Sequence, residues 1–199
     1  MSTYVIGDVQ GCYDDLQVLL KKINFEKSKD KLIFCGDLVN RGGKSLKVLR
    51  WIYKNRENCQ VTLGNHDLSL LAQYYVPKLR KKRNLEFQKI FRAKECNVLM
   101  DWLCRQNLVI NLKKYNTIVV HAGIHPFWSK KRALKESKKL EAKLSKNPVA
   151  IFEKMFGSKP NHWNKSLKGM DKTRFVINSF TRMRFLYKNS GLNFQNSIL

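Results

Sequence analysis

Three segments of the chain share one layout, in which a short apolar run ends in Gly-Asp or Gly-Asn-His-Asp and is followed by an amphipathic stretch. The runs are TYVIGD, KLIFCGD and QVTLGNHD, at residues 3–8, 31–37 and 60–67. Apolar runs that alternate with helical patterns at this spacing predict β-α-β-α-β units and a mostly parallel sheet. This layout places the chain in the α/β class.

The stretches between and after these runs predict helices. Residues 13–23 and 45–55 carry apolar side chains at the helical spacing, and a third helix is expected after the last run, ending near Pro77. A fourth buried strand is expected at residues 115–126, and a further strand within residues 174–185. The pattern is thus regular in the first third of the chain and mixed afterwards.

Two further segments, at about residues 78–112 and 129–148, have a mainly helical pattern. The second predicts a solvent-exposed helix with a thin apolar stripe. No internal repeat, low-complexity tract or clear linker divides the sequence. We therefore expect a single domain, residues 1–199, in which these two segments form a helical cap.

The composition indicates a packed globular protein. Of the 199 residues 43% are hydrophobic and 11% aromatic, which argues against disorder. No segment approaches the length of a membrane span, and the N-terminus lacks a signal pattern, so we expect a cytoplasmic protein without a membrane partner. Five scattered cysteines without a C-x-x-C pair fit reduced thiols. The oligomeric state is not predicted.

The net charge of +24 has two explanations. A polyanionic partner, either nucleic acid or a phosphate-rich small molecule, would favour such a surface. A composition rich in Lys, Asn, Ile and Phe, typical of an AT-rich genome, would produce the same charge. Basic runs at residues 78–83 and 129–132 slightly favour nucleic acid. Charge alone does not decide between these explanations.

Polar side chains follow each of the four predicted strands. They are Asp8, Asp37, Asn65, His66 and His121. The carboxyl ends of parallel strands meet at one edge of the sheet, where ligands bind, so we expect these side chains to lie together. Carboxylate, amide and imidazole ligands suit two divalent ions such as Mn²⁺, Mg²⁺, Co²⁺ or Fe²⁺. Such a pair activates water and clamps phosphoryl oxygens, so the pattern predicts a phosphohydrolase.

Arg41, His125 and His162 are three further polar residues that could belong to this site. Arg41 follows the second aspartate and is placed to make a forked contact with a phosphate. His125 and His162 lie outside the strand-end pattern, and we expect both to be structural or surface residues.

The blocks D-x-Q-G, G-D-L-V-N-R-G, G-N-H-D and H-A-G occur in this order and resemble the signature blocks of the calcineurin-like metallophosphoesterases. G-D-V-Q-G-C-Y-D-D-L, S-L-K-V-L-R, G-N-H-D-L-x-L-L-A and F-T-R-M-R-F resemble, more specifically, the symmetrical bis(5'-nucleosyl)-tetraphosphatases. The resemblance covers residues 1 to about 188. It implies a β-sandwich core flanked by helices, and hydrolysis of diadenosine tetraphosphate to two ADP by a water that two divalent ions activate.

The resemblance also implies which residues hold the ions. Asp8 and Gln10 would hold the first ion, Asp37 would bridge both, and Asn65 and His121 would hold the second. Mn²⁺ or Co²⁺ is expected in preference to Mg²⁺.

The substrate contacts follow from the same resemblance. His66 would act as general acid for the leaving ADP, and Arg41 would grip the phosphate under attack. Arg182 and Arg184 would bind the rest of the polyphosphate. Asp37 joins His66 and Arg41 as a catalytic residue through its bridging position.

Three differences from the family pattern qualify these expectations. Gln10 stands where a histidine is usual, although the tetraphosphatase branch contains either residue. Asn40 stands where protein phosphatases carry an aspartate, which argues against that assignment. A Gly-His block that would follow the F-T-R-M-R-F block has no match up to Leu199, so we expect a second sheet with fewer strands. The enzyme would then be weakly active, inactive or dependent on a partner.

Two alternative functions stay open at this point. One is a broader phosphoesterase or a protein phosphatase, which uses the same chemistry on other substrates. The other is a catalytically impaired or dead remnant that binds nucleotide or RNA. The basic runs favour this function, whereas the complete set of polar strand-end residues argues against it.

Overall fold

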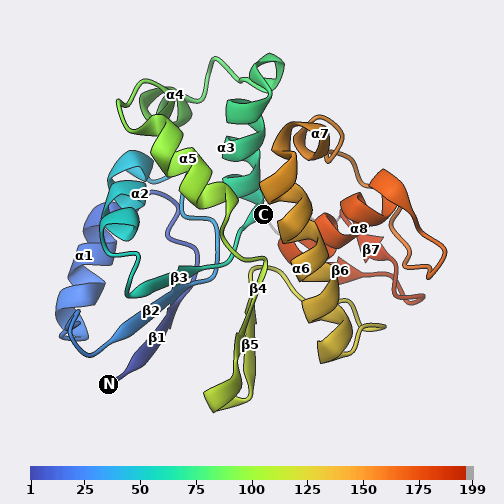
Figure 1. Ribbon diagram of the computed structural model, residues 1–199, viewed down its shortest axis with the longest axis horizontal. Helices are drawn as coiled ribbons and strands as arrows, with labels where there is room; N and C mark the ends of the chain where they lie inside the picture. The colour runs from blue at the N-terminus through green and yellow to red at the C-terminus, as the bar shows by residue number, and fades with distance from the viewer. Residues whose placement is uncertain (196–199) are drawn as a thin grey trace.

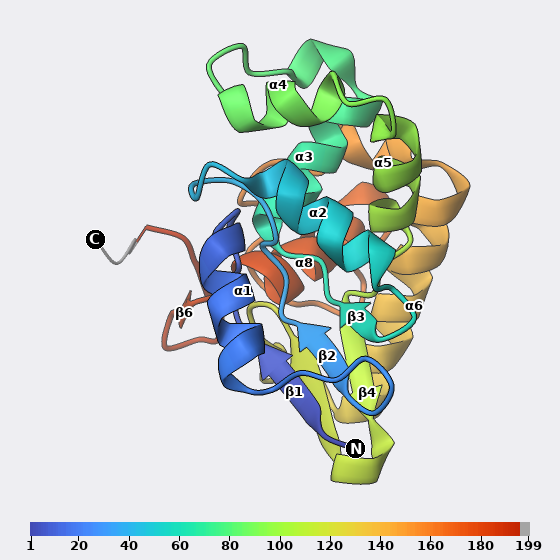
Figure 2. The same cartoon turned by 90° about the vertical axis from the view of Figure 1, so that its left-hand side faces the viewer.

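The computed structural model of the protein describes residues 1–195, which form small sheets and helices in layers (Figure 1). The first sheet is parallel, with strand order β1-β2-β3, and its strands are β1 (Thr3–Ile6), β2 (Lys31–Phe34) and β3 (Cys59–Val61). Helices α1 (Tyr13–Lys22) and α2 (Ser45–Lys54) connect these strands and lie on the outer side of the sheet (Figure 2). The predicted β-α-β-α-β start of the chain is confirmed.

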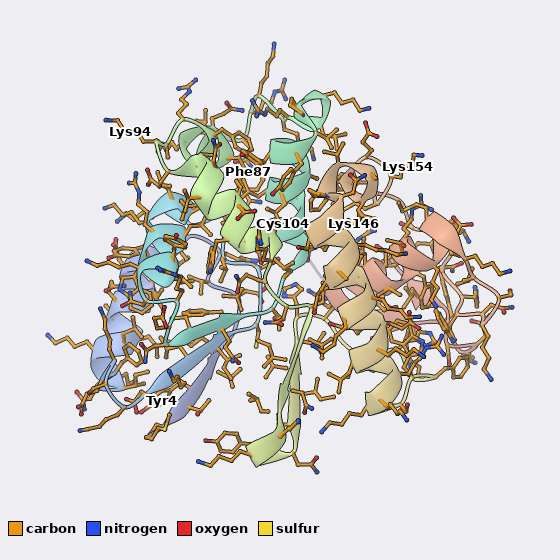
Figure 3. The ribbon with its side chains drawn as sticks, in the orientation of Figure 1. Tyr4, Phe87, Lys94, Cys104, Lys146 and Lys154 are labelled. Atoms are coloured by element: carbon orange, nitrogen blue, oxygen red, sulfur yellow. The ribbon has the colours of Figure 1, made fainter. Side chains whose placement is uncertain are left out.

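A helical layer follows, shown at the top of Figure 1. Its elements are α3 (Asn65–Tyr75), η1 (Pro77–Leu79), α4 (Leu85–Phe91) and α5 (Cys96–Cys104). Phe87 and Cys104 point inward between these helices, whereas Lys94 extends outward (Figure 3). Apolar burial holds these helices together and against α2, while Lys94 faces water.

The second half of the chain builds the other side of the molecule. An antiparallel pair, β4 (Val109–Leu112) and β5 (Thr117–Val120), is joined by η2 (Lys113–Tyr115). Beyond it lie the remaining elements, α6 (Lys130–Lys146), α7 (Pro148–Phe152), α8 (Gly169–Arg182), β6 (Phe185–Leu186) and β7 (Leu192–Asn193). From left to right in Figure 1 the layers are therefore α1 and α2, the parallel sheet, β4–β5, and α6 with α8.

The two sheets pack on each other through a small apolar cluster. Ile33 of β2 contacts Ile110 of β4 and Val119 of β5. A backbone hydrogen bond of 2.7 Å, from the Leu63 N–H to the Asn107 carbonyl, joins the end of β3 to the segment before β4. The result is a mixed α/β architecture with helices on both outer faces, as expected for the fold class.

A fourth strand lies within the predicted residues 115–126 and ends directly before His121, but its expected place in the parallel sheet was wrong. The strand is β5, which spans only Thr117–Val120 and pairs antiparallel with β4 rather than joining the first sheet. Residues 113–116 form a tight reversal in which Asn116 takes a left-handed conformation, with a φ of 47°. Such a short connection can join antiparallel strands only, because a parallel pair needs a long crossover.

The strand expected within residues 174–185 was also wrong for most of its length. Residues 174–182 belong to α8, and only Phe185 enters a strand. Phe175, Val176 and Ile177 favour a strand by local propensity, but all three are buried within α8, where tertiary packing overrides that propensity.

The segments expected to form a helical cap differ in their outcome. The segment at about 78–112 contains α4 and α5 but ends in strand β4, so its last four residues are not helical. The segment at 129–148 matches α6, whose apolar stripe is buried while its lysines face solvent.

One hydrophobic cluster runs through the described residues from Val9 to Leu192. The single-domain bounds of 1–199 stay a prediction, and residues 196–199 lie outside the described part.

Among residues 1–195, no helix combines the length and the apolar character that crossing a bilayer requires.

Lys154, at the end of the α7 turn, extends outward like Lys94 at the opposite side of the helical layer (Figure 3). The positive charge is thus spread over the surface.

Candidate metal centre

Four segments bring polar side chains to one place. Asp8 follows β1, Asp37 follows β2, Asn65 and His66 form the first turn of α3, and His121 directly follows β5. Ligand atoms of Asp8, Asp37 and His121 all lie within 4.8 Å of one another. The predicted residues therefore meet, although two arrive on a helix and one from the antiparallel pair rather than from a parallel edge.

The turn around Asp37 requires unusual backbone geometry. Gly36 and Asp37 have φ angles of 86° and 48°, in the left-handed region that favours glycine. Gly64, at the N-cap of α3, lies directly against Asp37, so a Cβ atom there would overlap the Asp37 carboxylate and its backbone nitrogen. The approach of α3 to the second strand end therefore depends on a glycine at position 64.

We predict that Gly64→Ala lowers the free energy of unfolding by about 1–3 kcal/mol through overpacking. The φ of −96° at Gly64 is open to any residue, so the effect is steric. The same change should weaken Mn²⁺ binding, since it displaces Asp37. Chemical denaturation and calorimetric Mn²⁺ titration measure both effects. Gly7→Ala is the matched control, because a Cβ at Gly7 meets no atom within 4 Å; equal stability of the two variants would contradict the prediction.

His121 is oriented as metal-ligating histidines usually are. Its side chain is 1% exposed, and its Nδ1 lies 2.7 Å from the backbone carbonyl of Cys35, to which it must donate. The other nitrogen, Nε2, then carries a lone pair. A ligating histidine typically donates its second ring N–H to a carbonyl in this way.

Several acceptor atoms face that lone pair. Asn65 Oδ1 lies 3.2 Å from His121 Nε2, and Asp37 Oδ2 lies 3.6 Å from it. Lone pairs that point at one another are unfavourable unless a cation lies close to them, and the Arg184 guanidinium, with its Nη2 3.1 Å from His121 Nε2, places one positive charge there. The donor set of carboxylate, amide oxygen and imidazole nitrogen therefore fits a divalent metal ion.

The carboxylates of Asp8 and Asp37 lie close enough for their charges to repel each other. Asp37 is buried, with 3% of its side chain exposed, whereas 42% of the Asp8 side chain is exposed. Burial raises the pKa of Asp8 above its usual value and the neighbouring Asp37 charge acts in the same direction, while His121, Arg184 and His66 act in the opposite direction. A divalent ion would remove this repulsion.

Gln10 lies beside Asp8 in the first turn. Its Nε2 lies 3.5 Å from Asp8 Oδ2, at the limit of a hydrogen bond, and its backbone N–H donates to the Asp37 carbonyl over 2.8 Å. The φ of 46° at Gln10 bends the chain so that both contacts form. The position is compatible with a ligand, and the ligand role of Gln10 stays a prediction.

His66 faces the same centre from the start of α3. Its backbone N–H donates to Asp37 Oδ1 over 2.8 Å, and its Nε2 lies 3.8 Å from Asp37 Oδ2. Its Nδ1 accepts from the side-chain amide of Asn40 over 2.9 Å. Because Nδ1 accepts, the ring proton sits on Nε2, which points into the centre.

Two contributors to this geometry were not predicted from the sequence. Asn84, before α4, donates from its side-chain amide to Asn40 Oδ1 over 3.3 Å and thereby orients the amide that holds His66. The Cys35 carbonyl orients His121. Asn40 drew attention only as a difference from the family, and neither Asn84 nor a backbone carbonyl has a local signature that would have identified it.

The three predicted arginines are placed differently. Arg184 reaches the centre, with its Nη2 3.1 Å from His121 Nε2. Arg182 instead donates to Asn178 Oδ1 over 3.0 Å and packs on the Phe194 ring. Arg41 lies on an exposed turn, and its guanidinium makes no hydrogen bond or ion pair with any of residues 1–195.

His125 is a core residue, as expected, and His162 is exposed at the surface. The His125 ring is fully buried among Phe127, Trp128 and Phe175. Its Nε2 donates to the Ser190 carbonyl over 2.9 Å and its Nδ1 accepts from the Phe127 N–H. Both ring nitrogens are thus satisfied in the neutral form only.

We predict that this histidine makes stability depend on pH. Burial lowers the pKa of His125 below its usual value of 6.5, so the unfolded state binds the proton more readily. The stabilisation is complete above about pH 6.5 and is lost as the pH falls, by at most about 1.4 kcal/mol per pH unit. Denaturation between pH 7.5 and 5.5 measures the slope. His125→Phe should flatten it, and an unchanged slope would contradict the assignment.

The fold and this centre together define a metal-dependent phosphoesterase. Residues 1–186 match the calcineurin-like phosphoesterase family, and the chain belongs to that family, whose members use divalent metal ions. The expected membership is confirmed.

The relatives point to one branch of the family. The chain is 42% identical over 196 residues to the symmetrical bis(5'-nucleosyl)-tetraphosphatase of Actinobacillus succinogenes, covering 98% of this chain and 70% of that protein. It is 44% identical over 198 residues to the protein of the same name from Marinomonas sp., covering 98% of this chain and 71% of the relative.

Solved structures agree with the fold. One is the crystal structure of a protein proposed to be a diadenosine tetraphosphatase, with a TM-score of 0.54 and 30% identity. The match covers 65% of this chain and 54% of that one, so the chain spans about half of its length. A cold-active protein tyrosine phosphatase also has a TM-score of 0.54, over 91% of this chain and 63% of that one. At 17% identity it shows the fold alone.

Proposed function

We propose that the chain hydrolyses diadenosine tetraphosphate at its symmetric bond and releases two ADP. The observation that carries this proposal is the convergence of the Asp37, Asn65 and His121 acceptor atoms on one point. This centre lies in a chain with more than 40% identity to relatives named for that reaction. The same centre supports the roles that follow.

Two divalent ions are proposed, with Mn²⁺ or Co²⁺ preferred over Mg²⁺. Asp8 and Gln10 would hold the first, Asp37 would bridge, and Asn65 and His121 would hold the second. When bound, the ions supply an activated water and a clamp on the phosphoryl oxygens. The set of Asp37, Asn65 and His121 acceptor atoms supports this arrangement for the second ion in particular, with the Arg184 guanidinium as the cation beside it.

The protein's own side chains position and protonate the substrate. His66 presents its Nε2 proton toward the centre, so it is placed to protonate the leaving oxygen of ADP. Arg184, beside His121, supplies positive charge for the polyphosphate, and Arg41 is proposed to grip the phosphate under attack from its exposed turn. Arg182 would act farther from the centre.

The alternative functions are less well supported. No relative described above is named as an RNA-binding protein, and the protein tyrosine phosphatase shares the fold only. A dinucleoside polyphosphate therefore remains the proposed partner, with nucleic acid not favoured and a membrane partner not proposed. A cytoplasmic location is proposed because all five cysteines, which lie within the described residues, are free thiols.

The test is product analysis on the purified chain. Mn²⁺, Co²⁺ and Mg²⁺ are titrated into the metal-free protein with diadenosine tetraphosphate, and the nucleotides are separated by chromatography. ADP as the only product, with release abolished by a chelator, is expected. Release of ATP and AMP, or no release with any of the three ions, would refute the proposal.

A further inference from the structure

A pocket of about 330 Å³ opens beside the metal centre. It is lined by residues of α3, of α8 and of the chain that follows α7, and in Figure 1 these segments lie from the centre of the picture to its right. Asn65, His66 and Arg182 are among its lining residues. The pocket therefore adjoins the metal centre at Asn65 and His66.

The walls of this pocket combine polar side chains with an apolar surface from Leu68, Met155, Phe156 and Ile177. Leu68, Met155 and Ile177 are almost fully buried behind it, while Phe156 is 52% exposed at its edge. The volume is at the lower end of the roughly 300–1,000 Å³ that small-molecule sites occupy, which suits a single nucleoside better than a whole dinucleotide.

We infer that this pocket binds the nucleoside of the leaving nucleoside diphosphate. The inference rests on the proposed function and extends it to one subsite. The leaving oxygen is the atom that His66 is placed to protonate, so the leaving half of the substrate lies on the His66 side of the centre. His66 is one of the residues that line the pocket, and the apolar part of its wall, from Leu68, Met155, Phe156 and Ile177, suits a base.

The charge of the pocket supports this division of the substrate. Arg182 is the one cationic side chain among its lining residues, all of which belong to the described chain. The Asn178 amide oxygen and the Gly157 carbonyl hold its guanidinium over 3.0 and 3.2 Å. A single fixed cation in the pocket suits the diphosphate, and the aromatic face of Phe156 suits a base, because nucleobases stack well on aromatic rings.

Equilibrium binding tests the pocket without any turnover. ADP and pyrophosphate are titrated calorimetrically into the Mn²⁺-loaded protein and into Phe156→Ala. The variant should raise the Kd for ADP about tenfold, in the lower part of the range for one stacked base, and leave the Kd for pyrophosphate unchanged. Ser69→Phe, which places a ring in the pocket from α3, should do the same.

Phe127→Ala is the matched control, because Phe127 is 64% exposed and lies outside the pocket. It should leave both dissociation constants unchanged. The inference is overturned if the wild type binds ADP no more tightly than pyrophosphate, or if Phe156→Ala and Ser69→Phe leave the Kd for ADP unchanged or weaken both ligands equally.

Steady-state kinetics separate this inference from the proposed function. With diadenosine tetraphosphate, Phe156→Ala should raise KM about tenfold and leave kcat within about twofold, since the lost contact is present in both the ground state and the transition state. An unchanged KM would overturn the subsite. A wild type that releases no ADP but binds it with the expected discrimination would refute the function and leave the nucleoside pocket standing.

Discussion

Replacing Asp37 by asparagine is expected to lower kcat/KM for diadenosine tetraphosphate by at least about 10³-fold. Metal-assisted charge stabilisation contributes several kcal/mol to hydrolysis, and each 1.36 kcal/mol is a factor of ten in rate. Asp37 is the buried carboxylate at the middle of the cluster, close to both His66 and His121. The amide keeps an acceptor for the His66 N–H but removes the charge that a bridging ligand must supply.

Asp37→Asn should also bind Mn²⁺ far more weakly. Measuring the Mn²⁺ affinity therefore shows whether the lost activity comes from a lost metal ligand or from a lost proton donor. Asp101→Asn is the matched control, because Asp101 is an exposed carboxylate paired with Arg105 on α5. Surface pairs of this kind contribute about 0–1 kcal/mol, so the control should keep its activity. An unchanged circular dichroism spectrum would show that Asp37→Asn folds. If the folded variant then retains more than about a tenth of the activity, the bridging role of Asp37 is ruled out.

The sequence was sufficient to identify the residues of this centre because each one follows a strand that its own apolar pattern reveals. Asp8 and Asp37 end two runs whose alternation with helices determines both the class of fold and the edge where they meet. His121 was identified through a wrong intermediate step, since β5 is antiparallel and belongs to another sheet. Its place depends on packing between β2 and the β4–β5 pair, which no local pattern encodes.

The residues that orient the centre could not be identified from the sequence for a related reason. The Cys35 carbonyl that holds His121 is 86 positions away in the chain, and Asn84 is 44 positions from the Asn40 amide that it orients. The Asn84 contact forms only when α4 packs against the turn after β2, and the Cys35 contact forms only when the β4–β5 pair packs beside β2. Tertiary packing also decides the structure of α8, where Phe175, Val176 and Ile177 favour a strand by local propensity.

Replacing His66 by alanine is expected to lower kcat by about 10²–10⁴-fold while leaving Mn²⁺ affinity nearly unchanged. The first effect follows from the Nε2 proton, which the Asn40 amide maintains by donating to Nδ1. The second follows because His66 is not among the proposed ligands. His162→Ala is the matched control, since that imidazole is exposed at the surface. Parallel losses of Mn²⁺ affinity and activity in His66→Ala would instead make His66 a ligand.

Leaving-group dependence decides whether the lost activity is proton donation. The wild type and His66→Ala are compared on two aryl esters of a nucleoside polyphosphate, one of phenol and one of 4-nitrophenol. Phenolate needs a proton as it leaves and 4-nitrophenolate needs it much less, so the loss should be clearly larger for the phenyl ester. An equal loss on both esters would show that His66 stabilises charge or binds phosphate without donating a proton. Its Nε2, 3.8 Å from Asp37 Oδ2, would then act through its position beside the carboxylate.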